Sequence, residues 1–342
     1  MRVLVAGIGG ASLGTEVLKC LELAGTYDSF GCDVSPYAFG HYQGGTLKTF
    51  VVPADGYVEA VLDLCQRHGI EAVIPGGEEP LQLLASASKL FEHAGIWLAI
   101  NAPTVVTTCS DKRRLFSRLT DLGLPVPWTA AVADVATMRN LKDIPLPCVV
   151  KPATGSGGSA SVYLAASLAE ARALVDGLLE NGRTVLVQEY VPEDGGEFSI
   201  GTLSRTDTQL IGSIVMKRLF HAKLSVHLRS NTGLISSGYG QGLIDDFPDI
   251  RLQAERIASA LGNAGPLDIQ GRVRDGILLP FEINPRFSGS VFLRAMAGFN
   301  QVDAFLQSFR TGSTPEIGPV RHGFYLRSLS EVFVPKAAVK AA

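Results

Sequence analysis

The chain opens on a regular alternation of two residue patterns, which constrains its fold more than any other feature. Short apolar-rich runs predict buried strands at residues 2–6, 29–33, 49–53, 71–75 and 96–100. The runs between them repeat apolar residues at helical spacing and predict helices around residues 17–23, 57–68 and 80–93. Strands that alternate with helices form a parallel sheet with helices on both faces. We therefore predict a parallel α/β domain over residues 1–102.

The pattern changes beyond this domain. Helices are predicted at residues 110–122, 167–181, 248–261 and 290–310, and strands at 146–151, 184–188, 197–204, 209–216 and 277–283. Residues 217–241 form a long segment that we expect to be irregular. A chain of 342 residues suggests more than one domain, at about 150 residues each.

Composition excludes several classes of protein. Lysine and arginine total 30 against 33 acidic residues, so no general basic excess is present for nucleic acid. No apolar run reaches the roughly 18 residues that a membrane-spanning helix needs. The five cysteines are scattered without a CxxC pair, which argues against zinc and disulfide frameworks and favours a reducing, cytoplasmic compartment.

A first glycine-rich motif, GIGGASLG at residues 7–14, follows the first predicted strand, and Asp33 follows the second. Such a turn can hold a pyrophosphate at a helix N-terminus, while an acidic residue binds a ribose. This interpretation predicts an NAD-dependent dehydrogenase. The simpler alternative is that these glycines only allow a tight turn from strand to helix.

A second glycine-rich motif, VVKPATGSGGSASV, has a lysine at the end of a predicted strand. Its small residues let backbone N–H groups close over phosphate oxygens, and the lysine adds a fixed positive charge. The order of residues is not that of a Walker A loop. The candidate phosphate ligands are Lys151, Gly155, Ser156, Gly157, Gly158 and Ser159.

Two further segments complete a candidate nucleotide site. The crossover after the strand at 184–188 offers backbone groups to an adenine edge, and Glu197 lies within reach of ribose hydroxyls. Glu282 and Asn284 alternate along a strand and therefore share one face, as do Asp268 and Gln270 on the strand before it.

These four oxygen-bearing side chains suit Mg²⁺, a hard cation that also binds phosphate oxygens. The two strands are predicted to form a hairpin, which would bring the side chains together. Arg286 follows the pair and could stabilise charge on a transferring phosphoryl group.

The order of these motifs resembles the ATP-grasp superfamily over nearly the whole chain. The motifs are, in order, Lys112, Lys151, the Gly157-Gly158 loop, Gln188-Glu189, Glu197, Gln270 and FEINPR. The stretch DIQGRV…FEINPRFSGSVFLRAMAGFN is most similar to one synthetase unit of the carbamoyl-phosphate synthase large subunit. The GIGG and GCDVSPYAFG stretches are similar to the Rossmann-like domain that precedes ATP-grasp domains and binds no dinucleotide, which speaks against the NAD interpretation.

The resemblance implies a Rossmann-like domain at residues 1–102, ATP-grasp lobes at 103–188 and 189–334, and a tail at 335–342. It implies that Lys112 and Lys151 contact ATP phosphates, that Glu189, Tyr190 and Val191 meet adenine, and that Glu197 binds the ribose. It implies that Gln270, Glu282 and Asn284 bind Mg²⁺ or Mn²⁺ and that Arg286 contacts a reacting acyl phosphate.

The implied function is an ATP-dependent carboxylate–amine ligase with small-molecule substrates; a homodimer is one arrangement open to it. The chain has one synthetase unit, no glutaminase region, and Gly289 where family members tend to have a second arginine. These departures favour a carboxylate larger than bicarbonate. A kinase of bicarbonate or carbamate is the alternative within the superfamily, and a nucleotide-binding regulatory protein is the alternative outside it.

The acceptor side of the site is the least constrained. The basic segment 217–241 could hold a substrate carboxylate through Arg218 or Arg229, or could be a solvated loop. Glu78 and Glu79 follow the fourth strand and could hold a substrate ammonium. Ser288 is a further candidate substrate contact. Arg327, near the end of the chain, could face either a ligand or the solvent.

Overall fold

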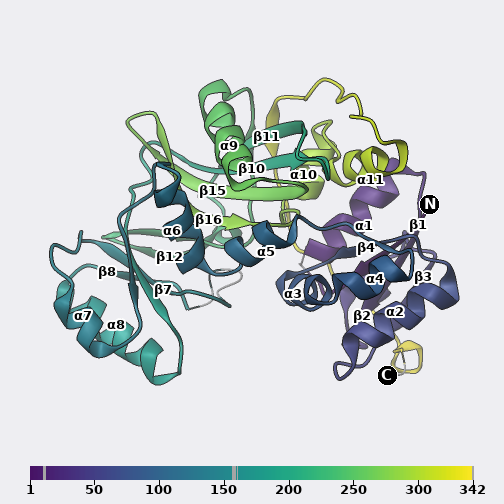
Figure 1. Cartoon of the computed structure of the whole chain (residues 1–342), viewed down its shortest axis with the longest axis horizontal. Helices are drawn as coiled ribbons and strands as arrows, with labels where there is room; N and C mark the ends of the chain where they lie inside the picture. Colours follow the sequence, from purple (N-terminus) through teal and green to yellow (C-terminus); the bar gives the residue numbers. More distant parts are fainter. Residues whose placement is uncertain (11–12, 156–158, 160, 341–342) are drawn as a thin grey trace.

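The computed structural model describes residues 1–10, 13–155, 159 and 161–340. Its first part is a parallel sheet of five strands in the order β3-β2-β1-β4-β5 (Figure 1). The strands are β1 (Arg2–Ala6), β2 (Asp28–Asp33), β3 (Lys48–Val51), β4 (Ala72–Pro75) and β5 (Trp97–Leu98). The helices are α1 (Leu13–Ala24), η1 (Phe39–His41), α2 (Tyr57–His68), α3 (Glu78–Ser86) and α4 (Ser88–His93).

Helices cover both faces of this sheet, as the alternating pattern predicted. Val3 and Val5 of β1 share a core with α1, whereas Leu4 and Ala6 share a core with α2, α3 and α4. Successive residues of a strand point to opposite faces, so four buried positions in a row require a cover on each side. The parallel α/β prediction is confirmed.

The second part is an antiparallel sheet in the order β6-β9-β7-β8, with helices on one face, at the lower left of Figure 1. It contains β6 (Thr129–Val132), α7 (Val135–Asn140), β7 (Cys148–Pro152), β8 (Tyr163–Ala165), α8 (Leu168–Glu180) and β9 (Val185–Glu189). Val150, Val187 and Val175 belong to a core of its own. This lobe therefore packs largely on itself.

The third part is a six-stranded antiparallel sheet in the order β16-β15-β10-β11-β14-β17 (Figure 1). Its strands are β10 (Glu197–Ser204), β11 (Leu210–Arg218), β14 (Gly242–Ile244), β15 (Pro266–Arg274), β16 (Ile277–Asn284) and β17 (Gly323–Tyr325). A separate hairpin consists of β12 (Val226–Ser230) and β13 (Gly233–Ser236). The helices are α5 (Pro103–Cys109), α6 (Lys112–Asp121), η3 (Lys223–Ser225), α9 (Pro248–Leu261), α10 (Val291–Met296), α11 (Gln301–Thr311) and η4 (Lys336–Ala338).

The first and third parts share one hydrophobic core. Val17 and Leu21 of α1 belong to the same cluster as Val291 of α10 and Val302 of α11. Helices α5 and α6 pack with α9 and the six-stranded sheet. The domain limits at residues 102, 188 and 334 stay a prediction, whereas the small sheet lobe has a hydrophobic core separate from this shared one.

Three expectations about secondary structure need correction. The helix expected at residues 80–93 is two helices, α3 and α4. The helix expected at 290–310 is also two, because Gly298 has a φ of 113° and Asn300 caps α11 by accepting a hydrogen bond from Asp303 N. The segment 217–241 is not simply irregular, since it contains the β12–β13 hairpin, closed by the two residues between Ser230 and Gly233.

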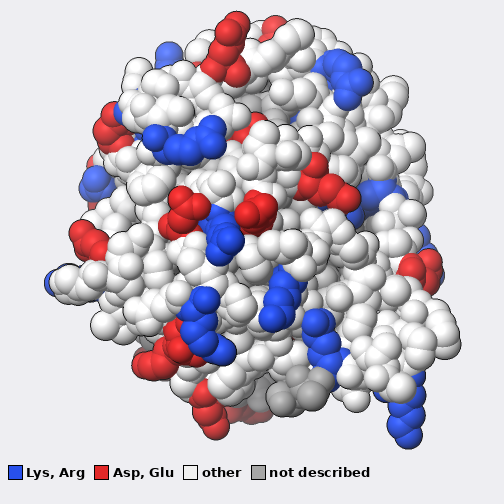
Figure 2. All heavy atoms as spheres, turned by 90° about the vertical axis from the view of Figure 1, so that its right-hand side faces the viewer, with Lys and Arg blue, Asp and Glu red and all other residues white. Residues whose placement is uncertain are grey.

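The surface charge and the length of the helices bear on possible partners. Figure 2 shows basic and acidic side chains interspersed on the face turned to the viewer, without a field of one sign. In the described residues no helix is both long and apolar enough to cross a membrane.

Candidate active site

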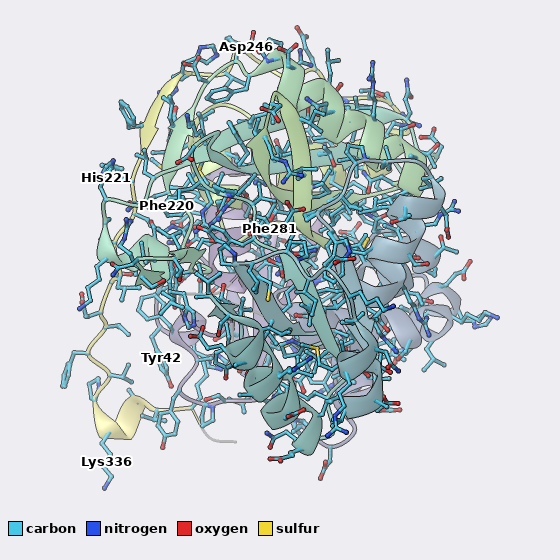
Figure 3. All side chains as sticks on the ribbon, turned by 90° about the vertical axis from the view of Figure 1, so that its left-hand side faces the viewer. Tyr42, Phe220, His221, Asp246, Phe281 and Lys336 are labelled. Atoms are coloured by element: carbon cyan, nitrogen blue, oxygen red, sulfur yellow. The ribbon has the colours of Figure 1, made fainter. Side chains whose placement is uncertain are left out.

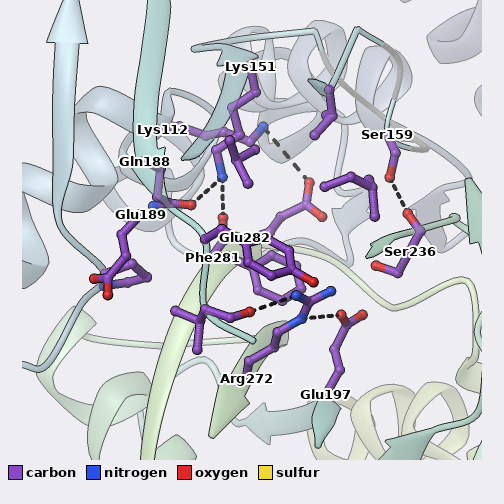
Figure 4. Close-up of a pocket in the computed structure, with 16 residues that line it drawn as sticks. Lys112, Lys151, Ser159, Gln188, Glu189, Glu197, Ser236, Arg272, Phe281 and Glu282 are labelled. Carbon is purple, nitrogen blue, oxygen red and sulfur yellow. Dashed lines mark hydrogen bonds and ion pairs between the residues drawn. The ribbon is translucent and has the colours of Figure 1, made fainter. Parts of the chain in front are cut away.

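A cavity lies where the small sheet lobe meets the β15–β16 hairpin (Figure 4). Figure 3 labels Phe281 of β16 near the middle of the molecule, where these parts meet. The cavity is walled by β7 and β9 on one side and by β13, β15 and β16 on the other. We call it the nucleotide cavity, because most of the residues predicted to bind a nucleotide line it. These are Lys112, Lys151, Ser159, Glu189, Tyr190, Val191 and Glu197, and the predicted metal ligand Glu282 lines the cavity beside them.

Lys151 is buried at the centre of this cavity, with 4% of its surface exposed. Its ammonium donates to Gln188 Oε1 and to Phe281 O, each at 2.8 Å (Figure 4). Burial, and then the nearby Lys112 charge, lower the pKa of Lys151 from 10.5 to about 7, against the opposing effect of Glu282. An ammonium has three donors, so one stays available to an anionic ligand. A bound anion would favour the charged form of this lysine.

The hairpin predicted for the metal ligands is confirmed. Gln270 pairs with Glu282 and Asp268 with Asn284 across β15 and β16. Gln270 Nε2 donates to Asp268 Oδ2 at 3.0 Å, which leaves the amide oxygen of Gln270 for another partner. Asn284 Nδ2 is buried without a hydrogen-bond partner in the described part of the chain.

These side chains fit a cation that also binds phosphate. Glu282, Gln270 and Asn284 present oxygen atoms, the donors that Mg²⁺ prefers. Asp268 is not available, because its Oδ1 binds the Arg294 guanidinium at 2.7 Å. Among the described residues, no three His, Cys, Asp or Glu side chains gather as a metal site. A metal held here would therefore have one protein carboxylate, that of Glu282, and would depend on oxygen atoms of a bound ligand.

Lys112 comes from the first turn of α6. Asp111 caps this helix by accepting a hydrogen bond from Arg113 N at 2.8 Å, and Lys112 N donates to Ala153 O at 3.0 Å. The Lys112 ammonium lies 3.9 Å from Glu282 Oε1. The cap at Asp111 thus fixes the start of the helix that carries this lysine into the site.

The residues predicted to meet adenine and ribose already form ion pairs and hydrogen bonds with other side chains of the protein. Both Glu197 oxygens are already engaged, Oε2 by Arg272 Nε at 2.9 Å and Oε1 by Arg218 Nη1 at 3.2 Å. Arg272 also donates to Val191 O at 2.7 Å and lies 4.9 Å from the centre of the Tyr190 ring. Arg272 was not predicted, although it continues the alternation of residues 268 and 270 along β15.

A larger cavity of about 860 Å³ adjoins the nucleotide cavity. Ser159 and Glu282 line both cavities. The larger one, which we call the acceptor cavity, is lined by five more of the predicted residues: Glu78, Gln270, Asn284, Arg286 and Ser288. Predicted phosphate, metal and acceptor residues thus meet along one boundary.

The second glycine-rich motif is described only at its ends. Gly155 has a φ of 66°, and Ser159 Oγ donates to Ser236 O of β13 at 2.7 Å (Figure 4). The predicted ligands Ser156, Gly157 and Gly158 lie outside the described residues. The Ser159 contact joins the small sheet lobe to the β12–β13 hairpin.

The substrate residues predicted in segment 217–241 do not line the acceptor cavity. Arg218 is 6% exposed and is used by Glu197 and by Ser237 O. Arg229 donates to Phe220 O at the outer edge, where Figure 3 labels Phe220. Glu78 does line the acceptor cavity, whereas Glu79 faces a separate hollow beside β1 and β4.

The first glycine-rich motif has a packing role. A Cβ on Gly14 or on Gly76 would lie 1.8 Å from Gly7 O, so these positions need glycine for close approach. The Asp33 carboxylate accepts hydrogen bonds from Ile8 N and Ser35 N, at 2.8 Å and 2.9 Å. Asp33 therefore holds the turn itself, which agrees with the tight-turn alternative.

Two sequence comparisons agree with this geometry. A family model described as an ATP-grasp domain matches residues 109–290, more than half of the chain. The carbamoyl phosphate synthase large chain of Thermomicrobium roseum is 27% identical over an alignment of 311 residues, and the match covers 86% of this chain and 26% of that protein. The chain thus spans about a quarter of that relative and about a fifth of the one from Vibrio cholerae, to which it is 26% identical over 63% of its own length.

Solved structures share the fold at low identity. L-amino acid ligase from Bacillus licheniformis has a TM-score of 0.66 and 18% identity, over 90% of this chain and 73% of that one. N5-carboxyaminoimidazole ribonucleotide synthetase from Thermus thermophilus has a TM-score of 0.67 and 19% identity, over 94% of this chain and 80% of that one. With the matching family model and the arrangement of both lobes, these findings establish that the chain belongs to the ATP-grasp family.

Proposed function

We propose that this protein is a ligase that uses ATP and Mg²⁺ to join a carboxylate to an amine. One observation carries the proposal: the nucleotide cavity and the acceptor cavity share Glu282 and Ser159. A group at the end of a nucleotide in the first cavity would therefore face a substrate in the second. Transfer of a phosphoryl group needs this positioning together with charge neutralisation, and no nucleophilic side chain.

Lys151 and Lys112 are the residues that would neutralise the nucleotide phosphates. Lys151 is the more strongly positioned, because two of its three donors are held by Gln188 and Phe281. Mg²⁺ would be held by Glu282, Gln270 and Asn284, and it would neutralise negative charge on the phosphate oxygens. Arg286 lines the acceptor cavity and would stabilise charge on the group that receives the phosphoryl.

The base would lie at the other end of the nucleotide cavity. Arg272 Nη1 occupies Val191 O at 2.7 Å, so Val191 would meet an adenine edge through its N–H group. Tyr190 is fixed by its hydroxyl, which donates to Glu193 and accepts from Leu234 N. Glu197 would accept a hydrogen bond from a ribose hydroxyl in addition to its ion pairs with Arg218 and Arg272.

The chemistry that follows is an acyl transfer. The carboxylate oxygen attacks the terminal phosphorus of ATP and ADP leaves, giving an acyl phosphate. The amine nitrogen then forms the C–N bond, the C–O bond to phosphate breaks with its electron pair, and the ammonium form of the amine gives up two protons in all.

A kinase of bicarbonate or carbamate is a second candidate, favoured by the identity to carbamoyl phosphate synthase large chains. The size of the acceptor cavity, about 860 Å³, speaks for a larger substrate, since such volumes accommodate drug-sized molecules. The two candidates differ in product: the kinase forms carboxy phosphate from bicarbonate or carbamoyl phosphate from carbamate, and the ligase forms an amide.

A screen for ADP release over carboxylates crossed with amines tests the proposal. The proposed ligase requires both substrates together and yields an amide by mass spectrometry. Release with bicarbonate and ammonia alone would favour the kinase. Binding of ATP without turnover for any pair would favour a regulatory nucleotide-binding protein instead.

A further inference from the structure

A second hollow of about 400 Å³ adjoins the acceptor cavity. It lies between α1, α10 and the segment after β17, and it shares Tyr239 and Arg327 with the acceptor cavity. We call it the side cavity. Its lining is mixed. One part of the wall is apolar and consists of Phe39, Phe292, Leu293, Met296, Leu326 and Leu329, whereas Glu16, Lys19, Gln43 and Arg327 are among the polar residues of the rest. The acceptor cavity thus meets a cavity with an apolar stretch of wall, and one arginine and one tyrosine line both.

The apolar wall is unusually exposed. Leu326 is 65% exposed, Leu329 is 54% exposed and Met296 is 39% exposed. Single exposed apolar side chains are ordinary, but several around one hollow mark a binding site. The hollow is continuous with the proposed substrate site, so the occupant that fits it is an apolar group of a substrate.

Arg327 is held firmly by one of its nitrogens. Its Nη2 donates to Gly289 O at 2.7 Å and to Glu16 Oε2 at 3.0 Å, and the side chain is 13% exposed. Its Nε and Nη1 have no hydrogen-bond partner within the described ranges. A guanidinium fork with free donors suits a carboxylate, which it can bind through two parallel hydrogen bonds.

The charged groups at Arg327 include more cations than anions. Glu16 is the acidic partner of Arg327, but its other oxygen accepts from Lys19 Nζ at 2.8 Å. Two cations therefore share one carboxylate. Lys19 is turned toward the apolar wall, 5.6 Å from the centre of the Phe292 ring. A ligand carboxylate at Arg327 would balance the local charge.

We propose that Arg327 and the side cavity select the substrate: they bind an amino carboxylate with an apolar side chain, such as L-leucine. Its unreacted carboxylate binds Arg327 and its side chain fills the side cavity. Its amino group then remains on the side of the acceptor cavity, where Arg286 lies. This assignment rests on the ligase function and adds the class of the amine substrate to it.

Titration calorimetry on the full chain, with Mg²⁺ and a non-hydrolysable ATP analogue present, tests this assignment. L-leucine should bind about tenfold or more tightly than L-alanine, which lacks the apolar group, and than leucinamide, which lacks the carboxylate. Arg327→Gln should lower the affinity for L-leucine about tenfold or more and leave the affinity for leucinamide unchanged. Arg327→Lys should restore only part of the lost affinity for L-leucine. Met296→Trp places a larger side chain in the wall of the side cavity, at the exposed end of α10. It should lower the affinity for L-leucine more than the affinity for L-alanine.

Arg321→Gln is the matched control, because Arg321 lies on the same segment, donates to Met296 O and lines neither cavity. It should leave every affinity unchanged. Equal affinity for L-leucine and leucinamide, or unchanged L-leucine binding in Arg327→Gln, would overturn the assignment. ADP release with other amines but no binding of L-leucine would overturn it and leave the ligase function standing. L-leucine binding as predicted, with no ADP release for any substrate pair, would refute the ligase function alone.

Discussion

Replacing Lys151 with methionine separates the charge of this residue from its packing. Lys151 is 4% exposed, and its ammonium donates to Gln188 Oε1 and Phe281 O, each at 2.8 Å. Methionine retains much of the lysine stem and removes the donor that remains for a phosphate. We expect kcat/KM for ATP to fall about 30-fold to 900-fold, which corresponds to an electrostatic contact of about 2–4 kcal/mol.

The same change should have little effect on folding, because two terms oppose each other. Burial, followed by the Lys112 charge, lowers the pKa of Lys151 to about 7, so the native site costs about 4 kcal/mol at pH 7 relative to the unfolded chain. Methionine removes this cost but leaves Gln188 Oε1 and Phe281 O without this donor, at about 1–3 kcal/mol each. The free energy of unfolding should therefore stay within about 2 kcal/mol of the wild-type value.

Steady-state ADP release at pH 7 and urea denaturation measure the two quantities. Lys217→Met is the matched control, since Lys217 Nζ lies 5.9 Å from the centre of the Phe198 ring and lines neither the nucleotide nor the acceptor cavity. A folded Lys151→Met protein with wild-type kcat/KM for ATP would refute the phosphate role. A loss of stability above about 4 kcal/mol would refute the balance of energies.

Three further changes test other parts of the structure. Glu282→Gln should lower ADP release about 100-fold or more, with partial recovery at raised Mg²⁺, and near-normal rates at low Mg²⁺ would contradict the metal assignment. Arg272→Ala should lower the free energy of unfolding by about 3–5 kcal/mol in urea, because it leaves Glu197 buried with one cation; a loss below about 1 kcal/mol would contradict this. Burial, and then Lys340, hold the pKa of His41 below its usual 6.5, so the unfolded chain takes up the proton first and stability should fall as the pH drops through about 6.5. His41→Gln should remove that part of the pH dependence, and an unaltered profile in urea titrations at pH 5.5 and 7.5 would argue against it.

Patterns local in the sequence predicted local structure well. The alternation of apolar runs predicted the parallel sheet, because strands buried on both faces need continuous apolar residues. The alternation of Asp268 with Gln270, and of Glu282 with Asn284, predicted the β15–β16 hairpin. Continuing that alternation by two residues would have found Arg272. Breaks inside helical patterns, such as the one near Gly298, were missed because the apolar spacing continues across them.

Features that depend on distant residues could not be predicted. Arg327 meets Glu16 across 311 positions of the sequence, and only the shared core of α1, α10 and α11 brings them together. Arg218 was a candidate for binding a substrate, but the structure uses it to neutralise buried Glu197. A sequence shows which side chains carry charge, whereas the choice of partner follows from tertiary packing.

Transfer of an oxygen isotope tests the central claim most directly. The carboxylate that gives the fastest ADP release in the screen is labelled with ¹⁸O in both oxygens and incubated with the protein, ATP, Mg²⁺ and the amine. Attack by a carboxylate oxygen on ATP, followed by loss of phosphate, predicts one ¹⁸O atom in each phosphate released, as read by mass spectrometry. Phosphate without label, formed together with the amide, would contradict the acyl-phosphate route and the role given to the boundary between the two cavities.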